Sequence, residues 1–335
     1  MQMRFIVLLI LILATNGFQS LHAQQRAYTI GNSLTNDMRP QLLDQSQWHI
    51  FCSKNLDFIF NNPDGNCVQT STPWPEAFQD FNFEYVVVQP FDGTTLIQDA
   101  NIISAWMQLQ PEATFVIHSG WTQSSTFPED YLAGNPDNTM RPSPEYVNDL
   151  IAQLKLIFPN RPIVQTHAND LLFSVWLDVQ QANAPGIRDV LFRNFGTNHE
   201  PIEWPFEIQH AEAEIELPFD EFSDIYRDFI HMDLQTGRYL MHNALRYAVR
   251  QPLFPRELFP GNSENEFLYL EDKIRTELVL MGDINRDRLV NLLDIQPFIE
   301  VLTDGIYDIT ADMNADNRAD LLDIGPFIDA ILNVQ

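Results

Sequence analysis

Short apolar runs alternate with helical stretches along the first three quarters of this chain, and this alternation limits the fold more than any other feature. The run 84–88 (Glu-Tyr-Val-Val-Val) is largely apolar and β-branched, as expected of a strand buried on both faces. Further strands are expected at 26–30, 113–118 and 162–166, and helices at 101–109, 146–158 and 234–249. This order predicts an α/β fold, with a mainly parallel sheet covered by helices on both faces in a three-layer α/β/α domain over residues 24–252.

The first 23 residues have the pattern of an export signal. A short, positively charged start precedes the apolar run 5–14, and a polar stretch then ends in Leu21-His22-Ala23. The apolar run is shorter than the roughly 20 residues that span a bilayer. We therefore expect cleavage after Ala23, a secreted or extracytoplasmic protein, and no membrane attachment afterwards. A retained N-terminal anchor is the alternative.

The chain is strongly acidic. It has 46 acidic and 19 basic residues, for a formal net charge of -27. A surface of this charge repels nucleic acid and anionic membranes, so neither is expected as a partner. It suits a protein that must stay soluble in salt, or one that binds divalent cations.

The chain contains two cysteines, Cys52 and Cys67. A closely spaced, even pair in an exported protein predicts one disulfide. A pair of free thiols is the alternative.

The C-terminal part, 278–335, is a duplicated acidic unit. Gly-Asp-Ile-Asn-Arg-Asp at 282–287 recurs as Ala-Asp-Met-Asn-Ala-Asp at 311–316. Leu-Leu-Asp-Ile-Gln-Pro-Phe-Ile at 292–299 recurs as Leu-Leu-Asp-Ile-Gly-Pro-Phe-Ile, also 29 residues later. An equal offset for both parts indicates one supersecondary element used twice. Prolines and a Gly-Asn-Ser run before the unit predict a linker over 253–277.

Each unit places oxygen-bearing side chains at positions 1, 3, 5, 9 and 12 of a loop, a spacing that suits calcium, which takes six to eight oxygen ligands. The expected ligands are Asp283, Asn285, Asp287, Asn291 and Asp294 in the first loop, and Asp312, Asn314, Asp316, Asp320 and Asp323 in the second. Position 6, which favours positive φ, is Arg288 in the first loop and Asn317 in the second. Because Asn tolerates that backbone better, we expect the second loop to bind more tightly. An acidic repeat that binds no metal is the alternative.

Over about residues 281–332 this unit resembles the dockerin type I domain. The resemblance implies a small all-α domain with two EF-hand-like calcium loops. It also implies a role in attachment, through a cohesin-like protein partner.

Two short segments far apart in the chain supply the parts of a nucleophilic hydrolase. Gly31-Asn32-Ser33 follows the first expected strand, and Asp228-Phe229-Ile230-His231 precedes a helix. A carboxylate three residues before an imidazole can fix its tautomer, which leaves the other nitrogen to take a proton from serine. We therefore expect Ser33 as nucleophile, His231 as general base and Asp228 as the acid that orients it. Asp92 and Asp170 are alternative acids, and an ordinary turn is the alternative reading of Ser33.

These two segments, in this order, resemble the SGNH (GDSL-like) hydrolase family over about residues 25–250, with Asn32 where Asp is commoner. The resemblance implies a flavodoxin-like sheet and hydrolysis of esters through an acyl-serine, without a catalytic cofactor. It implies an acylated carbohydrate or a small ester as substrate, and so a carbohydrate esterase or deacetylase.

The expected oxyanion hole departs from the pattern of that family. The family offers the amide of the serine, a glycine and the asparagine of a Gly-x-Asn-Asp block, and this chain has Gln-Pro-Phe-Asp-Gly at 89–93 instead. Gln89, Asn169 and Gly65 are the candidates for the missing donors. The departure leaves a second reading open: an inactive member of the fold that serves as a carbohydrate-binding or scaffold protein.

Overall fold

The computed structural model describes residues 27–38, 43, 45–187, 225–233, 236–254, 264–286, 289–305, 307–314 and 318–333. The expected export signal and two expected calcium ligands, Asp287 and Asp316, lie outside these ranges. Within them, no helix combines the length and apolar character that crossing a membrane requires.

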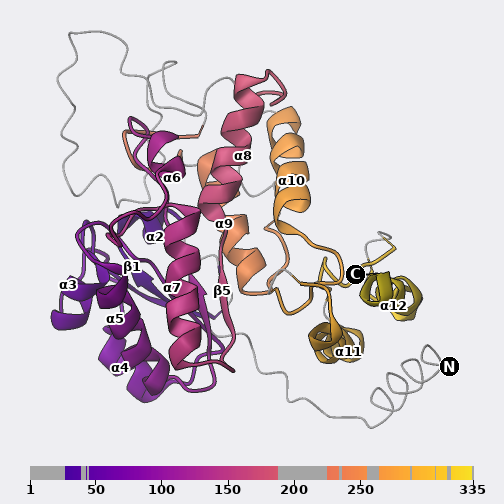
Figure 1. Cartoon of the computed structure of the whole chain (residues 1–335), viewed down its shortest axis with the longest axis horizontal. Helices are drawn as coiled ribbons and strands as arrows, with labels where there is room; N and C mark the ends of the chain where they lie inside the picture. Colours follow the sequence, from indigo (N-terminus) through magenta and orange to yellow (C-terminus); the bar gives the residue numbers. More distant parts are fainter. Residues whose placement is uncertain are drawn as a thin grey trace.

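A five-stranded parallel sheet forms the centre of the protein (Figure 1). Its strands are β1 (Ala27–Gly31), β2 (Gln47–Ile50), β3 (Tyr85–Val88), β4 (Thr114–Ile117) and β5 (Ile163–Gln165). They lie in the order β2-β1-β3-β4-β5, and every neighbouring pair is parallel. This is the order of flavodoxin-like sheets, in which ligands bind beyond the carboxyl ends of the strands. The predicted parallel sheet is confirmed, and β2 adds a strand that the sequence pattern did not predict.

Helices cover both faces of the sheet. One face carries α3 (Leu56–Asn61), α4 (Trp74–Asp80), α5 (Leu96–Leu109) and α7 (Pro144–Ile157). The other carries α2 (Ser33–Asp37), α8 (Ala168–Gln180), α9 (Thr236–Ala248) and α10 (Glu264–Leu278). Successive strand residues divide between these two cores: Val86 and Val88 face the first, and Tyr85 and Val87 the second. A short helix, α6 (Glu129–Leu132), interrupts the connection from β4 to α7.

The segment 253–277, which we expected to be a linker, instead contains most of α10. Phe267, Leu270, Ile274 and Leu278 recur at helical spacing and are buried in the same core as α8 and α9. The prolines that suggested a linker precede this helix. The α/β domain therefore extends through α10, and the prediction of a linker over this whole segment was wrong.

The duplicated unit folds as two equivalent halves. A 3₁₀ turn (Leu292–Asp294) leads into α11 (Ile295–Asp304), and an equivalent turn (Leu321–Asp323) leads into α12 (Ile324–Asn333). Phe298 and Phe327, at equivalent positions, stack with their ring centroids 4.0 Å apart. The two helices therefore share a small core of their own.

A buried arginine joins this unit to the α/β domain. The guanidinium of Arg286 donates two hydrogen bonds of 2.9 Å to Asp308 and lies 3.9 Å above the ring of Tyr247. It also donates to the carbonyl of Tyr247, near the end of α9. Because the residue is only 8% exposed, these contacts compensate a charge that burial would otherwise make costly. The duplicated unit is thus fixed against α9.

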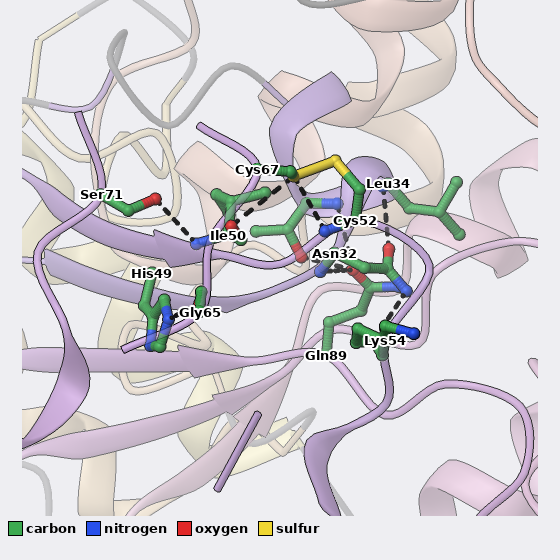
Figure 2. The surroundings of a disulfide bond; sticks show 11 residues. Asn32, Leu34, His49, Ile50, Cys52, Lys54, Gly65, Cys67, Ser71 and Gln89 are labelled. Carbon is green, nitrogen blue, oxygen red and sulfur yellow. Dashed lines mark hydrogen bonds between the residues drawn. A yellow bond between two sulfur atoms is a disulfide. The ribbon is translucent and has the colours of Figure 1, made fainter. Parts of the chain in front are cut away.

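The expected disulfide is present and links Cys52, just after β2, to Cys67 (Figure 2). The Cα atoms are 5.6 Å apart, within the range that a disulfide requires. Figure 2 places the bond beside Asn32, Lys54 and Gln89, so it closes the loop that borders the turn before Ser33.

We predict that losing this disulfide lowers the free energy of unfolding by about 3 kcal/mol. Without the cross-link between residues 15 positions apart, the unfolded chain gains conformational entropy and becomes more favourable. Urea unfolding of the Cys52→Ser/Cys67→Ser variant measures the loss. Reductant should destabilise the wild type to the same extent and leave the variant unchanged. A wild type that does not respond to reductant under unfolding conditions would contradict the prediction.

A buried carboxyl in α5 carries an unusual proton affinity. Burial raises the pKa of Asp99 to about 7, although hydrogen bonds from Tyr146 (2.7 Å) and Thr94 (3.0 Å) act in the opposite direction. The folded protein therefore holds this proton at pH values where the unfolded chain has already lost it.

We predict that the contribution of Asp99 to the free energy of unfolding falls as the pH rises from about 4 to about 7. Over this window the unfolded chain releases the Asp99 proton and the folded protein keeps it, which lowers the free energy of unfolding by at most about 4 kcal/mol. Asp99→Asn removes this titration, so its stability relative to the wild type should increase with pH. Urea unfolding at pH 5 and pH 8 measures the difference. Asp80→Asn, at an exposed position, is the control and should follow the wild type.

Candidate functional site

Ser33 begins α2, directly beyond the carboxyl end of β1. Asn32 precedes it as the N-cap: its Oδ1 accepts a 2.9 Å hydrogen bond from the amide of Leu34. The Nδ2 of Asn32 donates to the carbonyl of Lys54 over 3.4 Å, in the loop that the disulfide closes (Figure 2). Asn32 therefore shapes the turn and attaches it to the neighbouring loop, while Ser33 remains partly exposed.

Gln89 supports the same turn from the end of β3. Its Oε1 accepts hydrogen bonds from the amides of Asn32 (3.3 Å) and Thr35 (3.0 Å), and from the hydroxyl of Thr35. Three donors on one oxygen fix the orientation of the amide. Its Nε2 is buried, and among the described residues it has no hydrogen-bond partner.

Two hydrogen-bond donors are consequently left at this turn. Among the first three amides of α2, that of Leu34 is taken by Asn32 and that of Thr35 by Gln89. The amide of Ser33 donates to no acceptor within the described part of the chain. A Cβ on Gly120 would lie only 3.3 Å from the Gln89 Nε2, so this nitrogen lies against the backbone of Gly120. A backbone amide and a side-chain amide that both lack an acceptor are the kind of donors that an oxyanion hole requires.

The other two oxyanion candidates have different partners. Asn169 lies at the start of α8, which follows β5, three strands away from β1. Its Nδ2 donates to the carbonyl of Pro142. The amide of Gly65 donates to Asn62 over 3.1 Å, and its carbonyl lies 2.7 Å from the Nε2 of His49. We therefore do not retain Asn169 and Gly65 as donors.

Asp228 and His231 form the expected acid–imidazole pair. The Nδ1 of His231 lies 2.9 Å from one carboxylate oxygen of Asp228 and 3.2 Å from the other. That carboxylate also accepts the amides of Ile230 (2.8 Å) and His231 (2.7 Å), so its position follows from the backbone of its own loop. Burial raises the pKa of Asp228, but hydrogen bonds and the charge of His231 outweigh burial and lower it overall. Asp228 is thus an ionised acceptor that fixes the imidazole.

The loop 225–233 is anchored on residues that follow β4. The indole of Trp121 donates to the carbonyl of Ile230, and the amide of Ser124 donates to that of Phe229 over 2.7 Å. The hydroxyl of Tyr226 donates to the carbonyl of Thr122 over 2.9 Å. The carboxyl ends of β1, β3 and β4 therefore contribute, respectively, Ser33, Gln89 and the support for His231.

Asp37 connects the helix of Ser33 to the loop of His231. Its Oδ2 accepts the amide of Met232 over 2.9 Å, and its Oδ1 accepts Arg227 (3.0 Å) and Arg238 (3.1 Å). Asp37 lies four residues after Ser33, so the two share one side of α2.

The predicted triad is therefore assembled in part. The acid contacts the imidazole, and Met232, the residue directly after His231, makes the contact that reaches α2. Within the part of the chain that the structure describes, no hydrogen bond joins the Ser33 Oγ to His231.

A second acid–imidazole pair lies at the far end of the same edge of the sheet. The Nδ1 of His167 lies 2.7 Å from Asp170, which also accepts the hydroxyl of Tyr131 over 2.8 Å. Both belong to a pocket of about 490 Å³ between α7, α8 and the end of α10. Asp170 is thus committed to His167, which excludes it as an alternative acid for His231.

The expected calcium loops are closed by their position-12 carboxylates. Asp294 accepts the amides of Asn285 (3.0 Å) and Asn291 (2.8 Å), at loop positions 3 and 9. Asp323 accepts the amides of Asn314 (3.0 Å) and Asp320 (2.8 Å) in the same way. The carboxylates at positions 1 and 12 are buried in both loops: Asp283, Asp294, Asp312 and Asp323.

This donor set is of the type that suits a hard cation, because calcium takes carboxylate and amide oxygens as ligands. In the described ranges, which omit Asp287 and Asp316, no three His, Cys, Asp or Glu residues come together closely enough to hold a metal.

Comparison with known proteins gives likenesses of structure alone, since no family model and no curated protein matches the chain. A DUF4886 family protein from Bacteroides uniformis is 15% identical, over 75% of this chain and 94% of its own, with a TM-score of 0.41. A possible lipase from Chitinophaga pinensis is 13% identical, over 66% and 95%, with a TM-score of 0.31. A family two carbohydrate esterase from Cellvibrio japonicus is 10% identical, over 42% and 51%, with a TM-score of 0.26. At these scores the activity of this chain has to be argued from its own residues.

Proposed function

We propose that this protein is a serine ester hydrolase of the SGNH type, with Ser33, His231 and Asp228 as its catalytic residues. The observation that supports it best is the pairing of Asp228 with His231 at 2.9 Å in a loop that is bonded to the helix of Ser33. The disulfide supports an extracytoplasmic location, since such bonds persist in oxidising compartments. We further propose an acylated carbohydrate as substrate, on the resemblance to carbohydrate esterases within that family.

The geometry suggests the following reaction. The Ser33 Oγ attacks the ester carbonyl while the Nε2 of His231 takes its proton, and Asp228 holds the Nδ1 proton and stabilises the imidazolium. The amide of Ser33 and the Nε2 of Gln89 donate to the developing oxyanion. His231 then protonates the leaving alcohol, and water hydrolyses the acyl-serine to release the acid. The serine–imidazole hydrogen bond is often long in unliganded enzymes and shortens when substrate binds.

We predict that Ser33→Ala lowers kcat/KM for p-nitrophenyl acetate at least about 10³-fold, because the nucleophile is lost. Spectrophotometric release of nitrophenol measures the rate. Ser125→Ala, an exposed serine in the loop after β4, is the matched control and should retain wild-type activity. Equal rates in wild type and Ser33→Ala would contradict the proposal.

A second candidate function is an inactive member of the fold that binds carbohydrate or acts as a scaffold. Two observations favour it: the missing Gly-x-Asn-Asp block, and the lack of a hydrogen bond between Ser33 and His231 in the described part of the chain. A fluorophosphonate probe discriminates the two functions. Stoichiometric labelling of Ser33, lost in His231→Gln, would support the hydrolase, and no labelling of a folded protein would support the inactive reading.

We also propose that the duplicated unit binds two calcium ions and attaches the enzyme to a cohesin-like protein. The ligands would be the side chains at positions 1, 3, 5, 9 and 12 of each loop. Bound calcium would compensate the buried carboxylates and hold each loop closed, which is a structural role. Acyl transfer requires no metal in this proposal.

Calcium should raise the melting temperature of the full-length protein, because an ion that binds only the folded state stabilises it, by about 2.7 kcal/mol at a hundred times its Kd. Differential scanning calorimetry with calcium and with chelator measures this change, and titration calorimetry the number of sites. Asp323→Asn should remove one of two sites, whereas Asp329→Asn, exposed on α12, should leave both. Identical melting curves with calcium and with chelator would remove the proposal.

A further inference from the structure

We propose that Asp37 is a positioning residue of the acyl-transfer site, which fixes the loop of His231 to the helix of Ser33 and stabilises the imidazolium by its charge. This inference rests on the proposed function, since it assigns a role within that same site. Asp37 belongs to neither short segment that suggested the triad.

Asp37 connects two parts of the site, the helix of Ser33 and the loop of His231. The residue is 1% exposed and reaches across 195 positions of the sequence to accept the amide of Met232, the residue after His231. Arg227 donates both to Asp37 and to the carbonyl of Met232, so this ion pair holds the backbone of Met232 at its N–H and at its carbonyl. The position of His231 is therefore set from the helix that presents Ser33.

The charge of Asp37 is maintained although the side chain is buried. Burial raises its pKa, but the guanidinium groups of Arg227 and Arg238 more than reverse this effect, and the pKa is held at about 2. His231 also lowers the pKa of Asp37, which places the imidazole within the reach of this charge.

The charged groups around this junction come from three elements. Asp228, which contacts His231, belongs to its own loop together with Arg227, and Asp37 of α2 pairs with Arg227 and with Arg238 of α9. The same loop also contains Asp233, which accepts the amide of Thr236. The segment 121–124, which supports the loop from β4, contains no titratable residue. Neutralising Asp37 would leave both guanidinium charges without their shared partner, so it should disfavour the imidazolium. A residue that only supported the fold would not change this proton affinity.

The test is the pKa of His231, measured by NMR titration of histidine-labelled protein in a Ser33→Ala background, where no turnover is needed. Asp37→Asn should lower it by about 1 pH unit, because a charge near the imidazole is lost. Asp80→Asn, an exposed aspartate at the end of α4, should leave it unchanged. A His231 pKa that stays the same in folded Asp37→Asn protein would overturn the proposal.

Steady-state kinetics of enzyme that retains Ser33 provide the second measurement. Asp37→Asn should reduce kcat about 10- to 100-fold with little change in KM, and shift the acid limb of the pH–kcat/KM profile downwards by the same amount as the NMR pKa. Asp37→Glu keeps the charge and should restore the acid limb. A drop in kcat without any shift of the acid limb would reduce Asp37 to a structural residue and overturn the proposal.

A further variant keeps the inference testable if Asp37→Asn does not fold. Arg238→Gln retains a donor to Asp37 and removes a positive charge, so it should move the His231 pKa upwards, and an unchanged or lowered value would overturn the proposal. The two proposals also fail in different ways. A wild type without esterase activity, in which the His231 pKa still responds to Asp37, would reject the hydrolase. An active enzyme whose His231 ignores Asp37 would reject only the positioning role.

Discussion

The site depends on one buried oxygen, the Oε1 of Gln89. It accepts two backbone amides and a hydroxyl from the turn between β1 and α2, and so holds the end of β1 against the end of β3. Gly31 is required at this contact, because a Cβ there would lie 2.0 Å from the Thr35 hydroxyl and 2.9 Å from the Gln89 side chain. With the oxygen occupied, the amide nitrogen of Gln89 has one orientation, towards the backbone of Gly120. At this strand end the glutamine side chain reaches all three donors of the turn, whereas the side chain of asparagine is one methylene shorter.

Local patterns predicted the centre of the fold and missed its margins. The buried strands β3 and β4 are continuous apolar runs, and their order with α5 and α7 settles the parallel sheet. β2 was missed because Gln-Trp-His-Ile, an edge strand, has neither a continuous apolar run nor a clean alternation. α10 was missed because turn residues directly before it resembled a linker, and only its packing on α8 and α9 shows its role.

The site divides in the same way. Spacing alone predicted the contact of Asp228 with His231, because three residues bring the two side chains into one loop. Gln89 was recognised by its place at a strand end, although nothing in the sequence shows that its oxygen would be occupied. Asp37 could not be predicted, since its partners lie 190 to 201 positions away and no motif marks them. Gly65 and Asn169 were plausible by residue type, and tertiary contacts assign both elsewhere.

The insertion of Arg286 against Tyr247 has a mechanical consequence. A module on a flexible tether lets its enzyme sample a sphere of orientations around the anchoring point. Here the duplicated unit is clamped to the C-terminal part of α9, whose first turn carries the Arg238 that binds Asp37. α9 thus connects the duplicated unit, at its C-terminal part, to Asp37, at its first turn. A partner bound to the duplicated unit would therefore also set the direction in which the edge of the sheet that carries Ser33 and His231 faces its surroundings.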